Sequence, residues 1–243
     1  MFLPILLAAI AESIISFSGA LSVIWSETLA RRFAHWVLGF AIGALLGVTF
    51  FDILPESVGE LGAEAAFLYV VAGIIFFFLL EKIVLWYHYH REAYDVHPYT
   101  SLVLIGDAIH NAIDGVALAL AFLVSLPLGI ATTIAVLLHE VPQEIADFGL
   151  LLRGGYSRKR ALVVNFLVSL TTIAGALAAY AVGSWLEPLL PYALALIAGN
   201  FLYLALADLL PETHEHKGGA HFAAQAALMI IGVAVMYLLG TYF

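Results

Sequence analysis

The chain has 243 residues, of which 63% are hydrophobic and only 11% are charged. A soluble domain carries about a quarter charged residues, so this composition excludes a soluble globular protein and indicates a polytopic membrane protein. The sequence has no cysteine, which excludes disulfides and thiolate metal sites, and its net charge of −9 disfavours nucleic acid and favours cations as partners.

Eight stretches are long and apolar enough to cross a bilayer, which needs about 20 apolar residues per helix. They are 2–25, 36–56, 64–86, 100–124, 128–152, 161–183, 189–211 and 222–242. The connections are short, so residues 1–243 are expected to form a single all-α transmembrane domain. The first stretch resembles a signal peptide but lacks the basic residues that such a peptide needs, so it is interpreted as a retained span. Glu12, early in this span, is assigned no role.

The basic residues indicate the orientation of these spans. All nine Lys and Arg residues lie at or after the ends of the first, third, fifth and seventh spans, and the opposite loops contain none. The positive-inside rule makes the basic side cytoplasmic, so both termini are expected to face outward. The expected location is a cell membrane, plasma or inner.

An internal repeat relates the second span to the seventh. Residues 52–56 read Asp-Ile-Leu-Pro-Glu and residues 208–212 read Asp-Leu-Leu-Pro-Glu, at an offset of 156 residues. The acids of these two D-x-L-P-E segments are Asp52, Glu56, Asp208 and Glu212. Because the two segments end at opposite membrane faces, these acids are interpreted as sites where an ion enters and leaves. Ordinary helix-end carboxylates are the alternative.

The repeat extends beyond this motif, because Gly-Ala-Leu recurs at the same offset at 19–21 and 175–177. The two copies, at about 2–86 and 161–242, are five spans apart and therefore cross the membrane in opposite senses. Inverted repeats of this kind are typical of transporters. The expected fold is a 3+2+3 arrangement, in which the central pair of spans lies at about 100–152.

The central pair carries two clusters of ligand-type side chains. They are Asp107, His110, Asn111 and Asp114 in the fourth span, and His139, Glu140, Gln143, Glu144 and Asp147 in the fifth. Residues four apart share one face of a helix, and the tight turn around Pro127 makes the two helices antiparallel neighbours. Ionisable groups inside a membrane are costly and commonly functional. The mixture of imidazole nitrogen and carboxylate oxygen predicts a site for Zn²⁺, Fe²⁺ or Mn²⁺.

Four polar residues of the predicted spans are interpreted individually. Asp107 is either a direct ligand or a partner that orients His110. Asp147 is interpreted as lying near the inner mouth of the path. Asn165 and Asn200 are expected to form hydrogen bonds between helices.

Further histidines gather in two predicted cytoplasmic loops. They are His88, His90 and His97 in the first loop, and His214, His216 and His221 in the second. Histidine-rich tracts can bind metal, so these residues are either transient ligands for a departing ion or neutral loop residues.

The two motifs of the central pair resemble those of the ZIP (Zrt- and Irt-like) family of divalent-metal transporters. That family has H-N-x-x-D in its fourth span and H-E-x-P-H-E-x-G-D in its fifth. Here residues 110–114 read H-N-A-I-D and residues 139–147 read H-E-V-P-Q-E-I-A-D. The resemblance implies a homodimer, an elevator-like movement of the first, fourth, fifth and sixth spans, and transport toward the cytoplasm without a cofactor. The cargo it implies is Zn²⁺, with Fe²⁺, Mn²⁺ or Cd²⁺ as alternatives.

The resemblance also implies a binuclear metal site. Its first position would be formed by His110, Asp114, His139 and Gln143. Its second position would be formed by Asn111, Glu140 and Glu144, with Gln143 as a bridge. Gln143 stands where the family has a histidine, and an amide is a weaker ligand for zinc. The expected consequence is either a lower affinity or a preference shifted toward Fe²⁺ or Mn²⁺.

The competing function from another class is an intramembrane zinc-dependent hydrolase. His139 and Glu140 are similar to the start of an H-E-x-x-H motif. However, Gln143 replaces the second histidine and Pro142 interrupts the helix, so the zincin arrangement fails. The sequence therefore favours a transporter over an enzyme.

Overall fold

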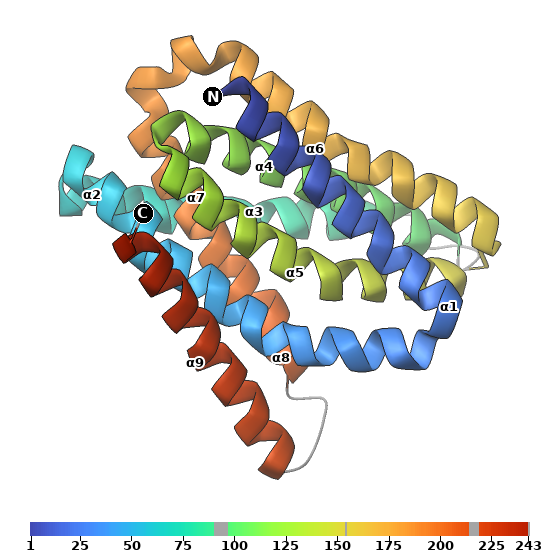
Figure 1. Cartoon of the computed structure of the whole chain (residues 1–243). Coiled ribbons are helices and arrows are strands. Elements are labelled where there is room, and N and C mark those ends of the chain that lie inside the picture. Colours follow the sequence, from blue (N-terminus) through green and yellow to red (C-terminus); the bar gives the residue numbers. More distant parts are fainter. Residues whose placement is uncertain (90–96, 154, 214–218, 243) are drawn as a thin grey trace.

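A computed structural model describes residues 1–89, 97–153, 155–213 and 219–242, which are helical almost throughout and contain no strand (Figure 1). The α-helices are α1 (Phe2–Val48), α2 (Leu54–Leu61), α3 (Ala63–Tyr89), α4 (His97–Val124), α5 (Leu126–Arg153), α6 (Arg158–Leu186), α7 (Leu190–Tyr203), α8 (Leu210–Glu212) and α9 (Gly219–Tyr242). Two π-helical segments, Thr49–Ile53 and Leu204–Leu209, join α1 to α2 and α7 to α8, and a 3-10 turn at Glu187–Leu189 precedes α7. The all-α prediction is confirmed.

Seven helical segments of the described chain are long and apolar enough to cross a membrane. They are Phe2–Ala30, Phe33–Leu61, Ala63–Ile83, Leu104–Val124, Arg158–Gly183, Leu190–Glu212 and Phe222–Thr241. They match seven of the eight predicted spans. The remaining one, predicted over 128–152, is present as the 28-residue helix α5, but α5 is not apolar enough to join the other seven. The physical reason is its polar content, because His139, Glu140 and Gln143 interrupt an otherwise apolar run.

The first two predicted spans are two helices that meet at a sharp bend with no loop between them. Helix α1 bends sharply at Ser26, whose backbone is extended (φ −158°, ψ 100°), as the lower right of Figure 1 shows. The hydroxyl of Ser26 accepts a hydrogen bond from the backbone N–H of Leu29 at 3.4 Å. A serine in this position caps the N-terminus of the helix that follows, so the chain changes direction without a loop.

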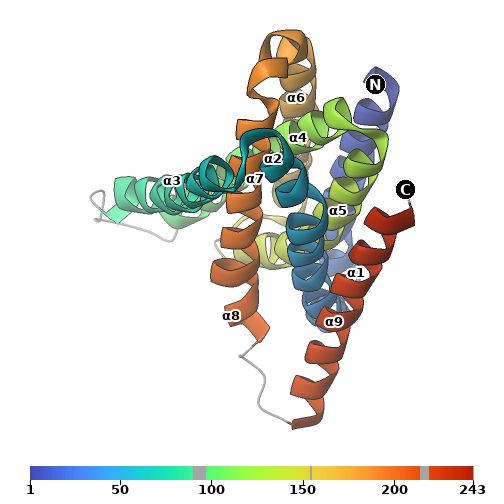
Figure 2. The same ribbon diagram turned by 90° about the vertical axis from the view of Figure 1, so that its left-hand side faces the viewer.

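The two halves of α1 pack against different partners. Gly19 in the first half lies against Glu144 of α5, and Gly43 in the second half lies against Met229 of α9. Elsewhere α4 packs on α6 and α3 packs on α7. In Figure 2, α3 and α9 lie on opposite sides of the molecule, with α4, α5 and α7 between them. The polar motifs of α4 and α5 are therefore enclosed by other helices.

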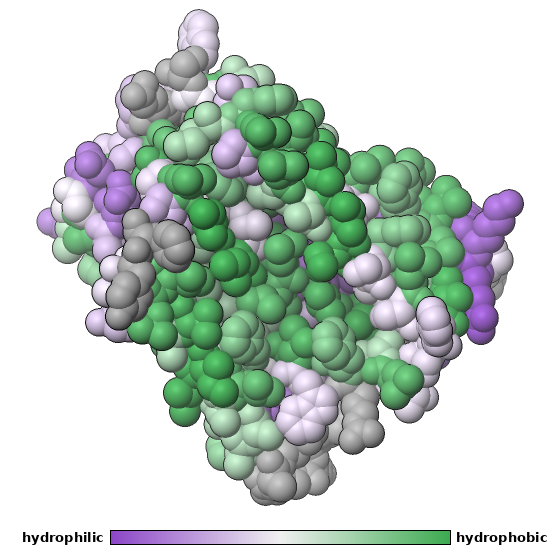
Figure 3. Space-filling model, in the orientation of Figure 1, coloured by the Kyte–Doolittle hydropathy of each residue, from purple (hydrophilic) through white to green (hydrophobic). Residues whose placement is uncertain are grey.

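The outer surface has the character expected of a multi-pass membrane protein. Large apolar side chains on α3 and α9 are exposed, among them Phe67, Leu68, Ile230 and Leu238. Figure 3 shows a hydrophobic surface over most of one face, with hydrophilic residues gathered at two opposite ends, near α2 and near the start of α6. An apolar belt between polar ends fits a protein that sits across a bilayer.

Glycine allows the backbones of α4 and α6 to approach closely. A Cβ atom at Gly175 of α6 would lie 2.1 Å from the carbonyl oxygen of Ala112, and one at Gly115 of α4 would lie 2.0 Å from that of Thr172. These oxygens belong to the backbone and cannot move aside as a flexible side chain would. Contacts of small residues are a common way to pack helices within a membrane.

Replacing Gly175 with alanine is therefore expected to destabilise the protein by about 1–3 kcal/mol, because the two backbones must separate. The measurement is thermal unfolding of the purified protein in detergent. Gly59→Ala is the matched control, because a Cβ atom at Gly59 meets no atom within 4 Å. Equal melting temperatures for the two variants would contradict the close packing of α4 on α6.

Candidate metal site

Helices α4 and α5 bring two histidines and an aspartate to one point. His110 Nε2 lies 3.2 Å from His139 Nε2, and Asp114 Oδ2 lies 3.0 Å from His139 Nε2 and 3.5 Å from His110 Nε2. The side chains of His139 and Asp114 are fully buried, and that of His110 is 16% exposed. Glu140 adds a carboxylate, and one atom from each of the four residues lies within 4.8 Å of the others. These four residues, the imidazole group, are close enough to hold one metal ion.

A second cluster adjoins the first and shares Glu140 with it. Asp107, Glu140 and Glu144 each offer a carboxylate oxygen, and these atoms lie within 4.8 Å of one another. All three side chains are buried. This cluster, the oxygen group, contains no nitrogen donor, whereas the imidazole group contains two. The two groups therefore suit divalent ions of different ligand preference.

Several buried oxygens of these groups have no hydrogen-bond donor. Within the described chain, Asp114 Oδ1 has no hydrogen-bond partner, and the carboxylate of Glu140 accepts no hydrogen bond from an N–H or hydroxyl group. Asp114 faces the two imidazoles, and Glu140 faces other acids. A buried carboxylate without a compensating partner is costly, and a bound cation is one such partner. The donor set thus fits a site whose occupant is positively charged.

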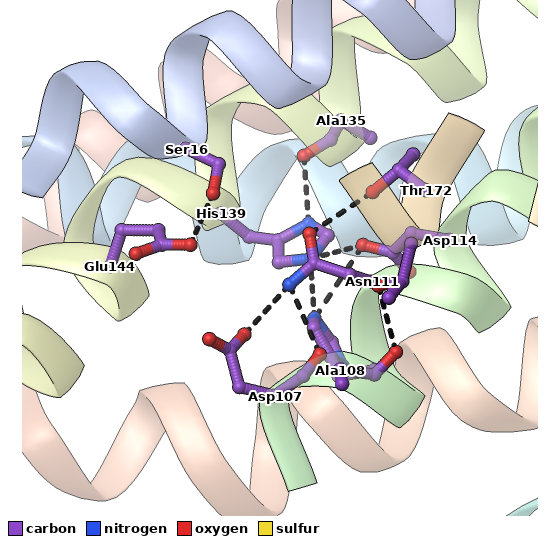
Figure 4. Close-up of polar contacts among 11 residues, drawn as sticks. Ser16, Asp107, Ala108, Asn111, Asp114, Ala135, His139, Glu144 and Thr172 are labelled. Carbon is purple, nitrogen blue, oxygen red and sulfur yellow. Dashed lines mark hydrogen bonds and ion pairs between the residues drawn. The ribbon is translucent and has the colours of Figure 1, made fainter. Parts of the chain in front are cut away.

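A backbone contact fixes the orientation of the buried histidine. His139 Nδ1 lies 3.1 Å from the carbonyl oxygen of Ala135, one turn earlier on α5 (Figure 4). A proton on Nδ1 donates to this carbonyl, which leaves the lone pair of Nε2 directed toward Asp114 and His110. Such a hydrogen bond selects the tautomer of a metal-binding histidine.

Asn111 bridges α6 to the oxygen group. Its Nδ2 donates to Asp107 Oδ1 at 2.7 Å and to the Asp107 carbonyl at 3.0 Å, and its Oδ1 accepts from Thr172 Oγ1 at 3.0 Å (Figure 4). The sequence predicted Asn111 as a direct ligand and left Asp107 open between ligand and orienting partner. In the structure the carboxylate of Asp107 lies within 4.8 Å of those of Glu140 and Glu144, and the side chain of Asn111 is hydrogen-bonded to Asp107.

Two other helices hold the carboxylate of Glu144. The hydroxyl of Ser16 on α1 and the amide of Asn165 on α6 both donate to it. The interhelical hydrogen bond predicted for Asn165 is therefore confirmed. Asn200 is buried on α7, but its Nδ2 has no hydrogen-bond partner in the described ranges.

The remaining predicted residues of α5 lie at the edge of the two groups. Gln143 is half-buried, and its Oε1 has no hydrogen-bond partner among the described residues. Asp147 follows one turn later and interacts electrostatically with Glu144 and with Glu212 of α8. Asp147 is therefore within electrostatic range of one acid of the oxygen group and of one acid at the end of the α7–α8 segment.

The acids of the two D-x-L-P-E segments do not belong to either group. Asp52 is half-buried and Glu56 is exposed, whereas Asp208 and Glu212 are both exposed and interact with each other. The predicted loop sites His214 and His216, like His90, lie outside the described residues.

Comparison with known proteins identifies the family. A family model described as ZIP Zinc transporter matches residues 90–240. Zinc transporter ZIP13 of Pongo abelii is 34% identical over 221 residues, covering 85% of this chain and 66% of that protein. Zinc transporter ZIP13 of Mus musculus is 32% identical over 266 residues, covering 91% of this chain and 73% of that protein. This chain belongs to the ZIP zinc transporter family.

Other relatives in the family are much longer than this chain. Zinc transporter ZIP10 of Danio rerio is 39% identical over 148 residues, which cover 58% of this chain but only 18% of that protein. The chain thus spans 66% of the ZIP13 of Pongo abelii and about a fifth of this ZIP10. These relatives are named zinc transporters and not enzymes, so the competing hydrolase interpretation has no support from the family.

The sequence analysis missed the contribution of α1 and α6 to this ZIP site. Glu12 and Ser16 of α1 and Thr172 of α6 are all fully buried, and Ser16 and Thr172 bond directly to residues of the two motifs. For Glu12 a signal was present, because an acid within an apolar span is costly and commonly functional. A serine or threonine within a span gives no such signal.

Proposed function

We propose that this chain carries a divalent transition metal across a membrane toward the cytoplasm, with Zn²⁺ as the first candidate and Fe²⁺, Mn²⁺ or Cd²⁺ as alternatives. The observation that carries the proposal is Glu140, which is fully buried between the imidazole group and the oxygen group. Ionisable groups placed so deeply in apolar helices mark ion pathways. The relatives named zinc transporters support the same activity.

The two groups are proposed to hold two ions side by side. The ligands of the first ion are His110, Asp114, His139 and Gln143. The ligands of the second ion are Asp107, Glu140 and Glu144. Glu140 bridges the two positions, a role that the resemblance had given to Gln143, and Asn111 acts by orienting Asp107. The shared placement of Glu140 in both groups and the unpartnered Oε1 of Gln143 support this assignment.

The test is uptake of radiolabelled Zn²⁺, Mn²⁺, Fe²⁺ and Cd²⁺ into liposomes that contain the purified protein. Saturable uptake of at least one of these ions above that of protein-free liposomes is expected. Uptake no faster than in empty liposomes for all four ions would overturn the proposed function.

Helix α5 is proposed as the fifth of eight spans. The helix is long enough to cross a membrane, and it is shielded from lipid by α1 and α4, so its polar ligands do not need to meet hydrocarbon. With eight spans both termini lie on the same side, and the distribution of basic residues favours the outer side. A cell membrane remains the proposed location, and a homodimer stays a prediction from the resemblance.

Several contacts support the proposed inverted repeat. Ser13 Oγ donates at 2.7 Å to the carbonyl of Ser169, its equivalent at the 156-residue offset. The equivalent glycines also have equivalent surroundings, because Gly19 of α1 packs on α5 and Gly175 of α6 packs on α4. The π-helical segments Thr49–Ile53 and Leu204–Leu209 precede the two repeated prolines. Close contact between equivalent residues is expected near a pseudo-two-fold axis.

The repeated acids are proposed to flank the path of the ion. Asp52 and Glu56 would receive the ion on the outer side, and Asp208 and Glu212 would release it on the inner side. Asp147 would connect the oxygen group with the inner acids, a role supported by its interaction with both Glu144 and Glu212. Exposed acids at each end concentrate cations there.

Metal uptake is expected to weaken in acid, because imidazoles and carboxylates must lose protons before they bind metal. Lowering the pH adds protons to these donors, so protons compete with the ion and uptake falls. The measurement is the initial rate of Zn²⁺ uptake between roughly pH 8 and pH 5, with equal pH on both sides of the membrane. A rate that does not change over this range would contradict the assigned ligands.

Replacing Gln143 with histidine is expected to raise the preference for Zn²⁺ over Mn²⁺ by on the order of tenfold, because imidazole is the better zinc ligand. The measurement is uptake of Zn²⁺ in competition with Mn²⁺. Thr133→Ala, a polar change on the same helix away from both groups, is the control. An unchanged preference would show that position 143 does not contact the ion.

A further inference from the structure

One face of α1 packs against the oxygen group. Glu12, Ser16 and Gly19 are spaced by four and three residues, so they lie on the same side of the helix. Ser16 donates a hydrogen bond to Glu144, and a Cβ atom at Gly19 would lie 2.9 Å from the Cβ of Glu144. This face of α1 therefore contacts α5 at Glu144, within the candidate metal site.

The position of Glu12 follows from the direction of the two helices. The first half of α1 and α5 run the same way, as Figure 1 shows. Glu12 lies one turn before Ser16, and Glu140 lies one turn before Glu144, so the Ser16–Glu144 contact places Glu12 on the face of α1 that is turned toward Glu140. Its carboxylate lies outside the set of oxygens that are within 4.8 Å of one another. Glu12 and Glu140 interact electrostatically.

Neither carboxylate is paired with a cation among the described residues, although Glu12 accepts hydrogen bonds from Ser13 and Thr172. Glu12 is fully buried, its Oε2 lies 3.4 Å from Ser13 Oγ, and its Oε1 has no hydrogen-bond partner in the described chain. Glu140 is fully buried, and its carboxylate accepts no hydrogen bond from an N–H or hydroxyl group among the described residues. Across those residues no lysine or arginine pairs with either acid. A cation between two buried acids would offset the cost of burying their charges.

We propose that Glu12 is a metal-binding residue that α1 contributes to the oxygen group as a fourth carboxylate. The proposal rests on the proposed function, since it assigns one more ligand to the second ion. With Glu12, the second ion position has four carboxylates and no nitrogen donor. It is therefore more negative than the first position, which contains the two histidines. Oxygen ligands suit Mn²⁺, so the second position is the one that takes an oxygen-preferring divalent cation.

The test is metal binding to the purified protein in detergent, measured by equilibrium dialysis after metal removal with a chelator. The probes are Mn²⁺ alone and Zn²⁺ alone. The wild type is expected to bind two ions of each kind. Glu12→Gln, which keeps the shape and removes the charge, is expected to keep the first ion and to weaken the second at least tenfold. The loss is expected to be larger for Mn²⁺ than for Zn²⁺.

The control is Glu60→Gln, the same change at an exposed acid on α2, which is expected to bind both ions as the wild type does.

Equal binding of both ions by Glu12→Gln and wild type would overturn the assignment, as would a wild type that binds only one ion. If Glu12→Gln does not give monodisperse protein, Glu12→Asp takes its place, because it keeps the charge and withdraws the oxygens by one methylene. Weaker binding of the second ion by Glu12→Asp supports the proposal, and unchanged binding overturns it. Binding is measured without flux, so absent uptake by the wild type would refute the proposed function separately.

Discussion

Replacing Glu140 with methionine is expected to reduce metal uptake by at least about 100-fold and to raise the stability of the metal-free protein. Glu140 is the carboxylate that the imidazole and oxygen groups share, so its loss weakens both ion positions. Partners that only orient a ligand already contribute about 10–100-fold to metal affinity, so a shared ligand is expected to contribute more. Without metal, however, the buried carboxylate of Glu140 accepts no hydrogen bond from an N–H or hydroxyl group, so it is expected to destabilise the fold. Methionine, which is of similar length and apolar, removes this cost of about 1–3 kcal/mol.

Two measurements on the same variant separate a ligand from a structural residue. Initial Zn²⁺ uptake into proteoliposomes reports transport, and thermal unfolding in detergent with excess chelator reports the stability of the metal-free protein. Glu64→Met, at an exposed acid at the start of α3, is the matched control and is expected to change neither. A Glu140→Met protein that is less stable than the wild type in chelator would indicate that Glu140 supports the fold and not the ion.

The sequence predicted the helical segments well where a single physical requirement determines them. A bilayer demands about 20 apolar residues per helix, and seven of the eight predicted spans satisfy that demand in the structure. The first span was predicted to end at residue 25, and α1 breaks at Ser26, where a capped bend leads directly into the next helix. Length and hydropathy detect a change of direction but do not distinguish a loop from a capped kink, because both interrupt the apolar run.

The sequence also predicted which residues of α4 and α5 would lie together. Four-residue spacing places His110 with Asp114, and the short turn between the helices brings that pair to His139. The place of Glu140 in both groups was not predicted, because it depends on how far each helix is rotated about its axis. That rotation is set by α1 and α6, which are distant in sequence and were not assigned to the site.

The hydrogen bonds from α1 and α6 couple the candidate metal site to the packing of four helices. Ser16 of α1 and Asn165 of α6 both hold Glu144, while Thr172 of α6 holds Asn111. The acids that these bonds gather repel one another, and an ion between them replaces that repulsion with attraction. Occupancy of the site therefore stabilises the packing of α1, α4, α5 and α6 as one unit. The resemblance to ZIP transporters predicted that these same four segments move together.

Replacing His139 with alanine is expected to reduce uptake by at least about 100-fold, and by more than the same change at His110. His139 is fully buried and its Nδ1 is fixed by the carbonyl of Ala135, so Nε2 is held ready for the ion, whereas His110 is 16% exposed. Radiotracer uptake of Zn²⁺ into proteoliposomes compares the two variants, with Thr133→Ala on α5 as the control at wild-type rate. Uptake by His139→Ala at the wild-type rate would show that the ion does not bind to His139 Nε2. The imidazole group would then not be part of the ion path.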